Sequence, residues 1–75
     1  MYFEALKIFC DVVRHKSFSR AAAANHISQS AVSQNVLQLE RSLGVRLIDR
    51  SKRPFQLTPE GMAMFRKAAK RIGND

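Results

Sequence analysis

Residues 28–43 carry a helical pattern that constrains the fold more than any other stretch of the chain. Ser28 is a favourable N-cap, because its hydroxyl can accept a backbone N–H of the first helical turn. One face is apolar, with residues at spacings of four, three and four: Val32, Val36, Leu39 and Leu43. The opposite face is polar and nearly uncharged: Gln29, Ser30, Ser33, Gln34 and Gln38. In a chain of only 75 residues, such a helix is expected to lay its apolar face on a single small core.

The polar face of this helix suits contact with the edges of DNA bases. Glutamine offers the paired donor and acceptor that match adenine in the major groove, and serine can contact several bases. A surface helix whose polar face meets only water explains the same pattern equally well when the helix is considered alone. The neighbouring segments decide between these two interpretations.

A shorter helix precedes this segment. Ser17 can cap a helix over residues 18–25, and the four alanines Ala21–Ala24 within it would let another helix cross closely. We expect Asn25 to take the left-handed conformation that ends this helix, and Ile27 to insert into the core. A short helix, a tight turn and a capped second helix are typical of a helix-turn-helix, here about residues 18–43, whose second helix reads DNA.

The flanking patterns complete a mainly α fold. Residues 1–15 predict a first helix with an apolar stripe of Phe3, Leu6, Phe9, Cys10 and Val13. Gly44 is a natural helix stop, and two β-compatible segments, Ile48–Arg50 and Phe55–Leu57, then predict a two-stranded wing over about residues 46–57. A last helix begins at Thr58–Glu60, and its apolar stripe is Met62, Phe65, Ala69 and Ile72. The expected fold is therefore a winged helix-turn-helix, with three helices and a two-stranded wing, followed by a C-terminal helix.

The charge of the chain indicates a polyanionic partner. Lys and Arg number 13 against 6 Asp and Glu, which gives a net charge of +7. Nucleic acid and an acidic membrane surface both fit such an excess. Three basic residues stand at the expected tip of the wing, where they could contact phosphates beside the reading helix: Arg50, Lys52 and Arg53.

Catalysis and metal binding have little support in the sequence. Ser28, Ser30 and Ser33 have no plausible triad partner, and His15 and His26 lie 11 residues apart. One cysteine and two scattered histidines do not supply four metal ligands, so we expect no enzyme, metal or cofactor. Cys10 is expected to be a buried small hydrophobe. Neither a signal peptide nor a transmembrane segment is visible, which predicts a cytosolic protein. The alternative function is a basic amphipathic helix over residues 59–72 that binds an anionic membrane or another protein.

The segment SFSRAAAANHISQSAVSQNVLQLERSLGVRLIDR, followed by LTPEG, resembles the DNA-binding domain of LysR-type bacterial transcriptional regulators. The resemblance covers Tyr2 to about Ile72 and rests on several motifs at fixed spacing, among them Ile27-Ser28-Gln29, Leu43-Gly44 and Leu57-Thr58 with Gly61. It implies a winged helix-turn-helix over residues 1–58 and a dimerising linker helix over 59–75. An effector-sensing domain normally follows, so we expect this chain to be the N-terminal part of a longer bacterial regulator.

The resemblance also implies roles for individual residues. Base-reading positions of the family fall on Gln29, Ser30, Ser33 and Gln34, and backbone contacts are expected from Arg20, Ser28, Gln38, Arg50, Lys52 and Arg53. Dimerisation would use Met62, Phe65, Ala69 and Ile72, and a two-fold dimer requires a pseudo-palindromic operator. The family often has Pro at the position of Ser30 and basic residues at those of Gln34 and Leu37. We therefore expect the wing and Arg20 to carry more of the phosphate contact, while Leu37 either touches a thymine methyl or packs within the protein.

Overall fold

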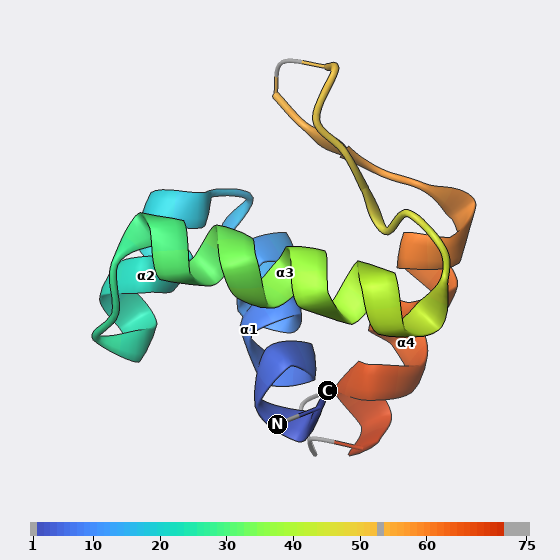
Figure 1. Cartoon of the computed structure of the whole chain (residues 1–75), viewed down its shortest axis with the longest axis horizontal. Helices are drawn as coiled ribbons and strands as arrows, with labels where there is room; N and C mark the ends of the chain where they lie inside the picture. The colour runs from blue at the N-terminus through green and yellow to red at the C-terminus, as the bar shows by residue number, and fades with distance from the viewer. Residues whose placement is uncertain (1, 53, 72–75) are drawn as a thin grey trace.

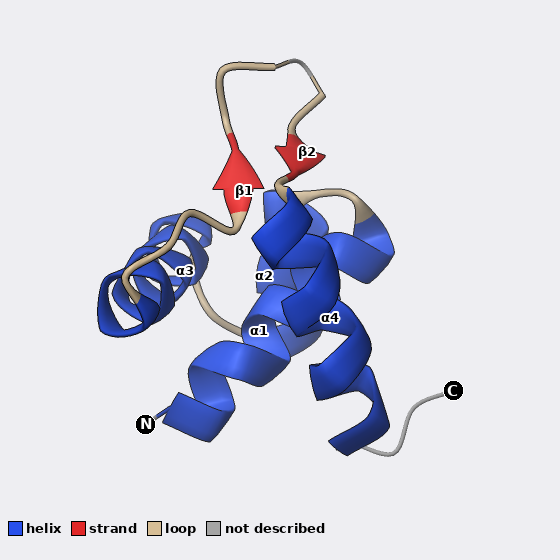
Figure 2. Cartoon of the chain, turned by 90° about the vertical axis from the view of Figure 1, so that its right-hand side faces the viewer, coloured by secondary structure: helices blue, strands red, loops and turns tan. Residues whose placement is uncertain are grey.

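The computed structural model of the chain describes residues 2–52 and 54–71. Its helices are α1 (Tyr2–His15), α2 (Phe18–Asn25), α3 (Gln29–Leu43) and α4 (Pro59–Arg71), and its strands are β1 (Ile48–Asp49) and β2 (Gln56–Leu57). The strands and their connecting loop project beyond the helices (Figure 1, Figure 2). This arrangement confirms the expected winged helix-turn-helix followed by a C-terminal helix.

Helix α1 lies at the centre of the helical layer and packs against α2, α3 and α4. Its buried side chains include the expected Leu6, Phe9 and Cys10, but also Ala5, Ile8 and Val12. The predicted stripe was too narrow, because three neighbouring helices cover more of the α1 surface than one apolar stripe does. Val13 is half-buried against this core, whereas Met1 and the side chain of Phe3 lie outside the described residues.

Both predicted caps of the helix-turn-helix are confirmed. The Ser17 hydroxyl accepts the Arg20 N–H at 3.1 Å, and the Ser28 hydroxyl accepts the Ala31 N–H at 3.1 Å. Two predictions about the turn between α2 and α3 were wrong: the left-handed conformation of Asn25 and the insertion of Ile27 into the core. His26, at φ 57, takes the left-handed conformation in place of Asn25.

Asn25 stays helical because its side chain is bound on both sides. Its amide donates to the Asp11 carboxylate of α1 at 2.9 Å and to the Ala21 carbonyl at 2.8 Å. Ile27 does not insert into the core and remains 36% exposed. The chain reverses at His26, and the Ile27 N–H closes the end of α2 by donating to the Ala22 carbonyl at 3.1 Å.

Helix α3 ends as predicted, at Gly44 with φ 72. Two-residue strands follow, antiparallel, with Ile48 opposite Leu57 and Asp49 opposite Gln56. They are one residue shorter than predicted, because Arg50 and Phe55 lie beyond the ladder and pack against the ring of Phe18.

Helix α4 buries a different face from the predicted one. Gly61 and Ala68 are buried, and Met64 and Phe65 are half-buried against the core. Met62, the first residue of the predicted apolar stripe, is 53% exposed, and Ile72 lies outside the described residues. The face differs because Gly61 lets the first turn of α4 rest on the backbone of Leu47: a Cβ at Gly61 would lie 2.1 Å from the Leu47 carbonyl oxygen.

The start of α4 is also held by hydrogen bonds. The Thr58 hydroxyl accepts the Gly61 N–H at 3.0 Å, and the Thr58 N–H donates to the Leu47 carbonyl at 3.1 Å. In the described part of the chain, none of the helices combines the length and the apolar character needed to span a membrane.

Candidate nucleic-acid interface

The polar face of α3 is presented outward by the burial of its opposite face. Val32, Val36 and Leu39 anchor α3 to the core. Gln29, Ser30, Gln34 and Gln38 are consequently exposed, and Ser33 is half-buried. The Ser28 cap fixes the first turn, and its hydroxyl lies 3.2 Å from that of Ser30. The expected base-reading residues thus lie on the outer side of a firmly held helix.

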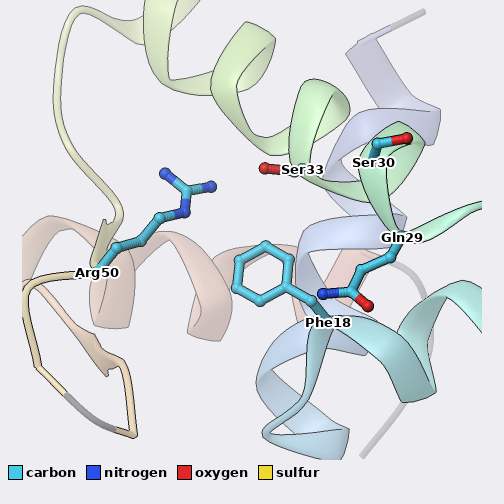
Figure 3. A pocket seen from close by; sticks show the side chains of 5 residues that line it. All are labelled: Phe18, Gln29, Ser30, Ser33 and Arg50. Atoms are coloured by element: carbon cyan, nitrogen blue, oxygen red, sulfur yellow. The ribbon is translucent and has the colours of Figure 1, made fainter.

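An open hollow of about 520 Å³ lies where α2, α3 and the wing meet. Figure 3 shows the side chains that line it, and we call it the polar hollow: Phe18, Gln29, Ser30, Ser33 and Arg50. It joins three uncharged hydrogen-bonding side chains of α3 to one cation and one aromatic ring. Four of the expected contact residues therefore meet in one place.

Other expected contact residues lie outside the polar hollow. Gln34 and Gln38 follow along the exposed face of α3, while Arg20 is exposed on α2 and Lys52 on the wing loop. Ser28 is exposed, with its hydroxyl oxygen already accepting the Ala31 N–H. Arg53 lies outside the described residues.

Arg50 does not stand at the tip of the wing, as the sequence suggested. Its guanidinium carbon lies 5.2 Å from the centre of the Phe18 ring, and its Nη1 lies 3.7 Å from Glu40 Oε1. The side chain is only 32% exposed. The cation is turned back toward the helices because ring and carboxylate both attract it.

Glu40 is the buried carboxylate that sequence reasoning missed. Its Oε2 accepts the N–H groups of Leu47, at 2.7 Å, and Ile48, at 3.1 Å. Buried charges are rarely found without partners. A glutamate on the apolar face of α3, one turn after Val36, therefore indicates a buried carboxylate with hydrogen-bond or ion-pair partners.

Phe18 is the second residue whose role was missed. Its ring meets that of Phe55 edge-on, with centres 5.3 Å apart, and also lies under Arg50. The first residue of α2 therefore joins the helix-turn-helix to the wing.

Two ionisable groups near these elements have shifted pKa values. Hydrogen bonds from the Ser51 hydroxyl and the Ser51 N–H lower the pKa of Asp49. The same two hydrogen bonds fix the start of the wing loop. Burial raises the pKa of the Cys10 thiol more than the nearby Arg14 lowers it, so this residue is the buried hydrophobe that was expected. Within residues 2–52 and 54–71, no three His, Cys, Asp or Glu side chains are grouped so that they could hold a metal ion.

A second hollow of about 350 Å³ lies at the other end of α3. Leu37 is half-buried and lines it, together with Arg41, Gly44 and Val45. Leu37 is the residue of this lining that the sequence connected with DNA, and it lies outside the polar hollow.

Comparison with known proteins gives one consistent result. Residues 3–62 match the family described as bacterial regulatory helix-turn-helix protein, lysR family. The chain is 48% identical over 65 residues to the HTH-type transcriptional regulator CrgA of Neisseria meningitidis serogroup C (strain 8013), covering 87% of the chain and 22% of that protein. It is 36% identical over 74 residues to the HTH-type transcriptional regulator BenM of Acinetobacter baylyi, covering 99% of the chain and 24% of that protein.

Solved structures agree with these relatives. The crystal structure of the BenM DNA-binding domain with catB site 1 DNA matches at a TM-score of 0.91 and 36% identity, over 96% of this chain and 77% of that one. DarR of Vibrio fischeri, also solved in complex with DNA, matches at 0.87 and 31% identity, over 93% and 24% of the two chains. The chain spans about a quarter of the length of the curated relatives CrgA and BenM.

Proposed function

The chain belongs to the LysR family of bacterial helix-turn-helix regulators, and from this membership we propose that it binds double-stranded DNA in a sequence-specific manner. The relatives named above are transcriptional regulators and not enzymes, which agrees with the expectation from the sequence. The observation that carries the proposal is the polar hollow, because it places the first turns of α3 beside a cation of the wing.

Base readout falls to the N-terminal part of α3. Gln29, Ser30, Ser33 and Gln34 lie on its outward side, and helices of this type contact base edges with their first turns. The uncharged donors and acceptors of these residues can distinguish base pairs in the major groove. Leu37 is half-buried farther along the helix, and we assign it no readout role.

Backbone contacts surround this readout surface. Arg50 flanks it from the wing, and the other residues proposed to contact phosphate or sugar are Arg20, Ser28, Gln38, Lys52 and Arg53. The Ser28 oxygen caps α3, yet its O–H can still donate to a phosphate oxygen. Contacts of this kind fix the register of the protein on the duplex.

The full regulator is proposed to act as a homodimer on a pseudo-palindromic operator in the bacterial cytoplasm. Helix α4, in the proposed linker segment 59–75, supports this: Met62 is exposed, Ala69 is half-buried, and Phe65 packs on the core. Among the predicted dimerisation residues that the structure describes, Met62 is the most exposed. Ile72 rests on the apolar stripe of the sequence and on the family resemblance. A small-molecule effector would bind a domain outside this chain.

The test of base readout is Gln29→Ala. A preferred duplex is first selected from random DNA with this chain, and binding of the selected and of a scrambled duplex is then measured. Gln29→Ala should weaken binding to the selected duplex by about 1–3 kcal/mol and relax the preference at one base position. Gln56→Ala, the same change at an exposed position of β2, serves as the control and should keep wild-type binding.

Three results would contradict the proposal. Equal losses on selected and scrambled duplex would remove base reading from Gln29. Failure of the wild-type chain to select any duplex at low salt would contradict DNA binding itself. Binding to vesicles of anionic lipid with no affinity for duplex DNA would favour the membrane alternative, given the basic face of α4.

A further inference from the structure

We propose that Glu40 is a positioning residue for DNA recognition, which holds Arg50 at the angle needed to meet a phosphate beside the polar hollow. The proposal rests on the proposed function, since it concerns how Arg50 reaches the same DNA. Glu40 itself lies under the surface, on the buried face of α3, and is not expected to contact DNA.

The carboxylate of Glu40 acts in two directions at once. Its Oε2 accepts the N–H groups of Leu47 and Ile48, which fixes the backbone that leads into β1. Its Oε1 lies 3.7 Å from Arg50 Nη1, two residues farther along the same backbone. One side chain of the reading helix thereby fixes both the origin of the wing and the direction of its arginine.

The second constraint on Arg50 comes from Phe18. The ring lies 5.2 Å from the guanidinium carbon and is itself braced edge-on by Phe55. Arg50 Nη2 is buried and has no hydrogen-bond acceptor among the described residues. Ring and carboxylate therefore hold the side chain while 32% of it stays exposed toward the solvent. A phosphate oxygen would reach the buried Nη2 only if the guanidinium turns outward, so the unpaired donor favours, but does not replace, contact through the exposed part of the side chain.

Glu40 has two opposite effects on DNA binding. Its negative charge offsets part of the attraction of Arg50 for phosphate, which lowers affinity for any duplex. Its hold on Arg50 removes rotamer freedom before binding, which favours a complex with one fixed register. Non-specific complexes depend on charge alone, whereas the specific complex also depends on register. Glu40 should therefore raise the preference for the selected duplex while lowering affinity for scrambled DNA.

Glu40→Gln separates these effects. Glutamine keeps an oxygen that can accept the Leu47 and Ile48 N–H groups, but its NH2 group would face Arg50 with another donor. The ratio of affinities for selected and scrambled duplex should fall by roughly 3- to 10-fold, in the range of couplings within one ion-pair network. Affinity for the scrambled duplex should be unchanged or higher, and the salt dependence of binding should not weaken.

Two further variants make the assignment specific. Glu60→Gln changes the net charge equally, at an exposed position in the first turn of α4, and should keep the wild-type ratio. Arg50→Ala should reduce the magnitude of the salt slope by about 1, and Glu40→Gln added to it should lower the ratio no further.

A measurement without DNA completes the test. Exchange of the Arg50 guanidinium protons, followed by NMR, should be slower in the wild type and in Glu60→Gln than in Glu40→Gln, because the ion pair and the burial of Nη2 restrict the side chain. The proposal would be overturned if a folded Glu40→Gln protein kept the wild-type ratio of affinities for selected and scrambled duplex and the wild-type exchange rate. It would also be overturned if Glu40→Gln lowered this ratio as much in the Arg50→Ala protein as in the wild type. Failure of the wild type to prefer any duplex would instead contradict the proposed function, and the NMR comparison would still decide whether Glu40 holds Arg50.

Discussion

Gly61→Ala should destabilise the domain, although alanine is the better helix former. The added Cβ would lie 2.1 Å from the Leu47 carbonyl oxygen and 3.0 Å from its carbon. Ordinary contact begins near 3.4 Å, so α4 and the residue before β1 must separate by about 1 Å. Neither group is a flexible side chain, and the clash cannot be relieved by a rotamer change.

The expected loss follows from two opposing terms. Replacing glycine by alanine in a helix gains up to about 1 kcal/mol, and overpacking against a rigid neighbour costs about 1–3 kcal/mol. A backbone carbonyl belongs at the upper end of that range, so the net loss should be about 2 kcal/mol. For a domain of this size, the midpoint of thermal unfolding should fall by roughly 8–16 °C.

Urea unfolding of the wild type, Gly61→Ala and Gly44→Ala tests the reasoning. Gly44 has φ 72 and open space around a built Cβ, so alanine there should cost only backbone strain, about 1 kcal/mol. Hydrogen exchange adds a local readout, since the Thr58 N–H that donates to Leu47 should lose protection in Gly61→Ala alone. A Gly61→Ala protein as stable as the wild type would refute the argument from close approach.

Two further predictions concern the wing loop and the association surface. In Ser51→Ala, loss of the hydroxyl donor should raise the pKa of Asp49 toward its ordinary value, measured by NMR titration. Because the pKa of Asp49 is depressed in the folded state, the ionised side chain stabilises the fold above its unfolded pKa, and this stabilisation is lost as the pH falls through its folded pKa. Ser51→Ala and the wild type should therefore differ in stability at neutral pH and be equally stable at low pH. Met62→Glu should reduce concentration-dependent association in sedimentation experiments without changing the unfolding midpoint, because Met62 is exposed. An unchanged association constant would show that the contact does not involve Met62. Phe65→Glu is a less suitable test of association, because Phe65 packs on the core and its replacement would also destabilise the fold.

Local chemistry was predictable from the sequence where one residue type has one dominant use. The hydroxyl caps at Ser17 and Ser28 and the left-handed stop at Gly44 follow from backbone demands that few other residues meet. The outward face of α3 was predictable for a similar reason, since its apolar residues repeat at helical spacing.

Features that depend on contacts between distant residues were not predictable. Asn25 was a good candidate for the left-handed position, but Asp11, 14 residues earlier, binds its side chain. The buried face of α4 was assigned by apolar character, whereas the packing depends on where a glycine lets two backbones meet. Arg50 was placed at the tip of the wing because it stands close to Lys52 and Arg53 in the sequence. Its partners Phe18 and Glu40 lie 32 and 10 positions away in the sequence, so no local pattern points to them.

Leu47 couples α3 to α4 through hydrogen bonds of its backbone N–H and carbonyl groups. Its N–H donates to Glu40 of α3, and its carbonyl accepts from Thr58 at the start of α4. The reading helix and the C-terminal helix are therefore linked by hydrogen bonds through Leu47 at the base of the wing, in addition to their shared packing on α1. A tilt of α4 relative to α3 must break one of these hydrogen bonds or carry the wing with it. If α4 contacts a second subunit as proposed, a force on α4 would change the angle between the wing and the reading helix.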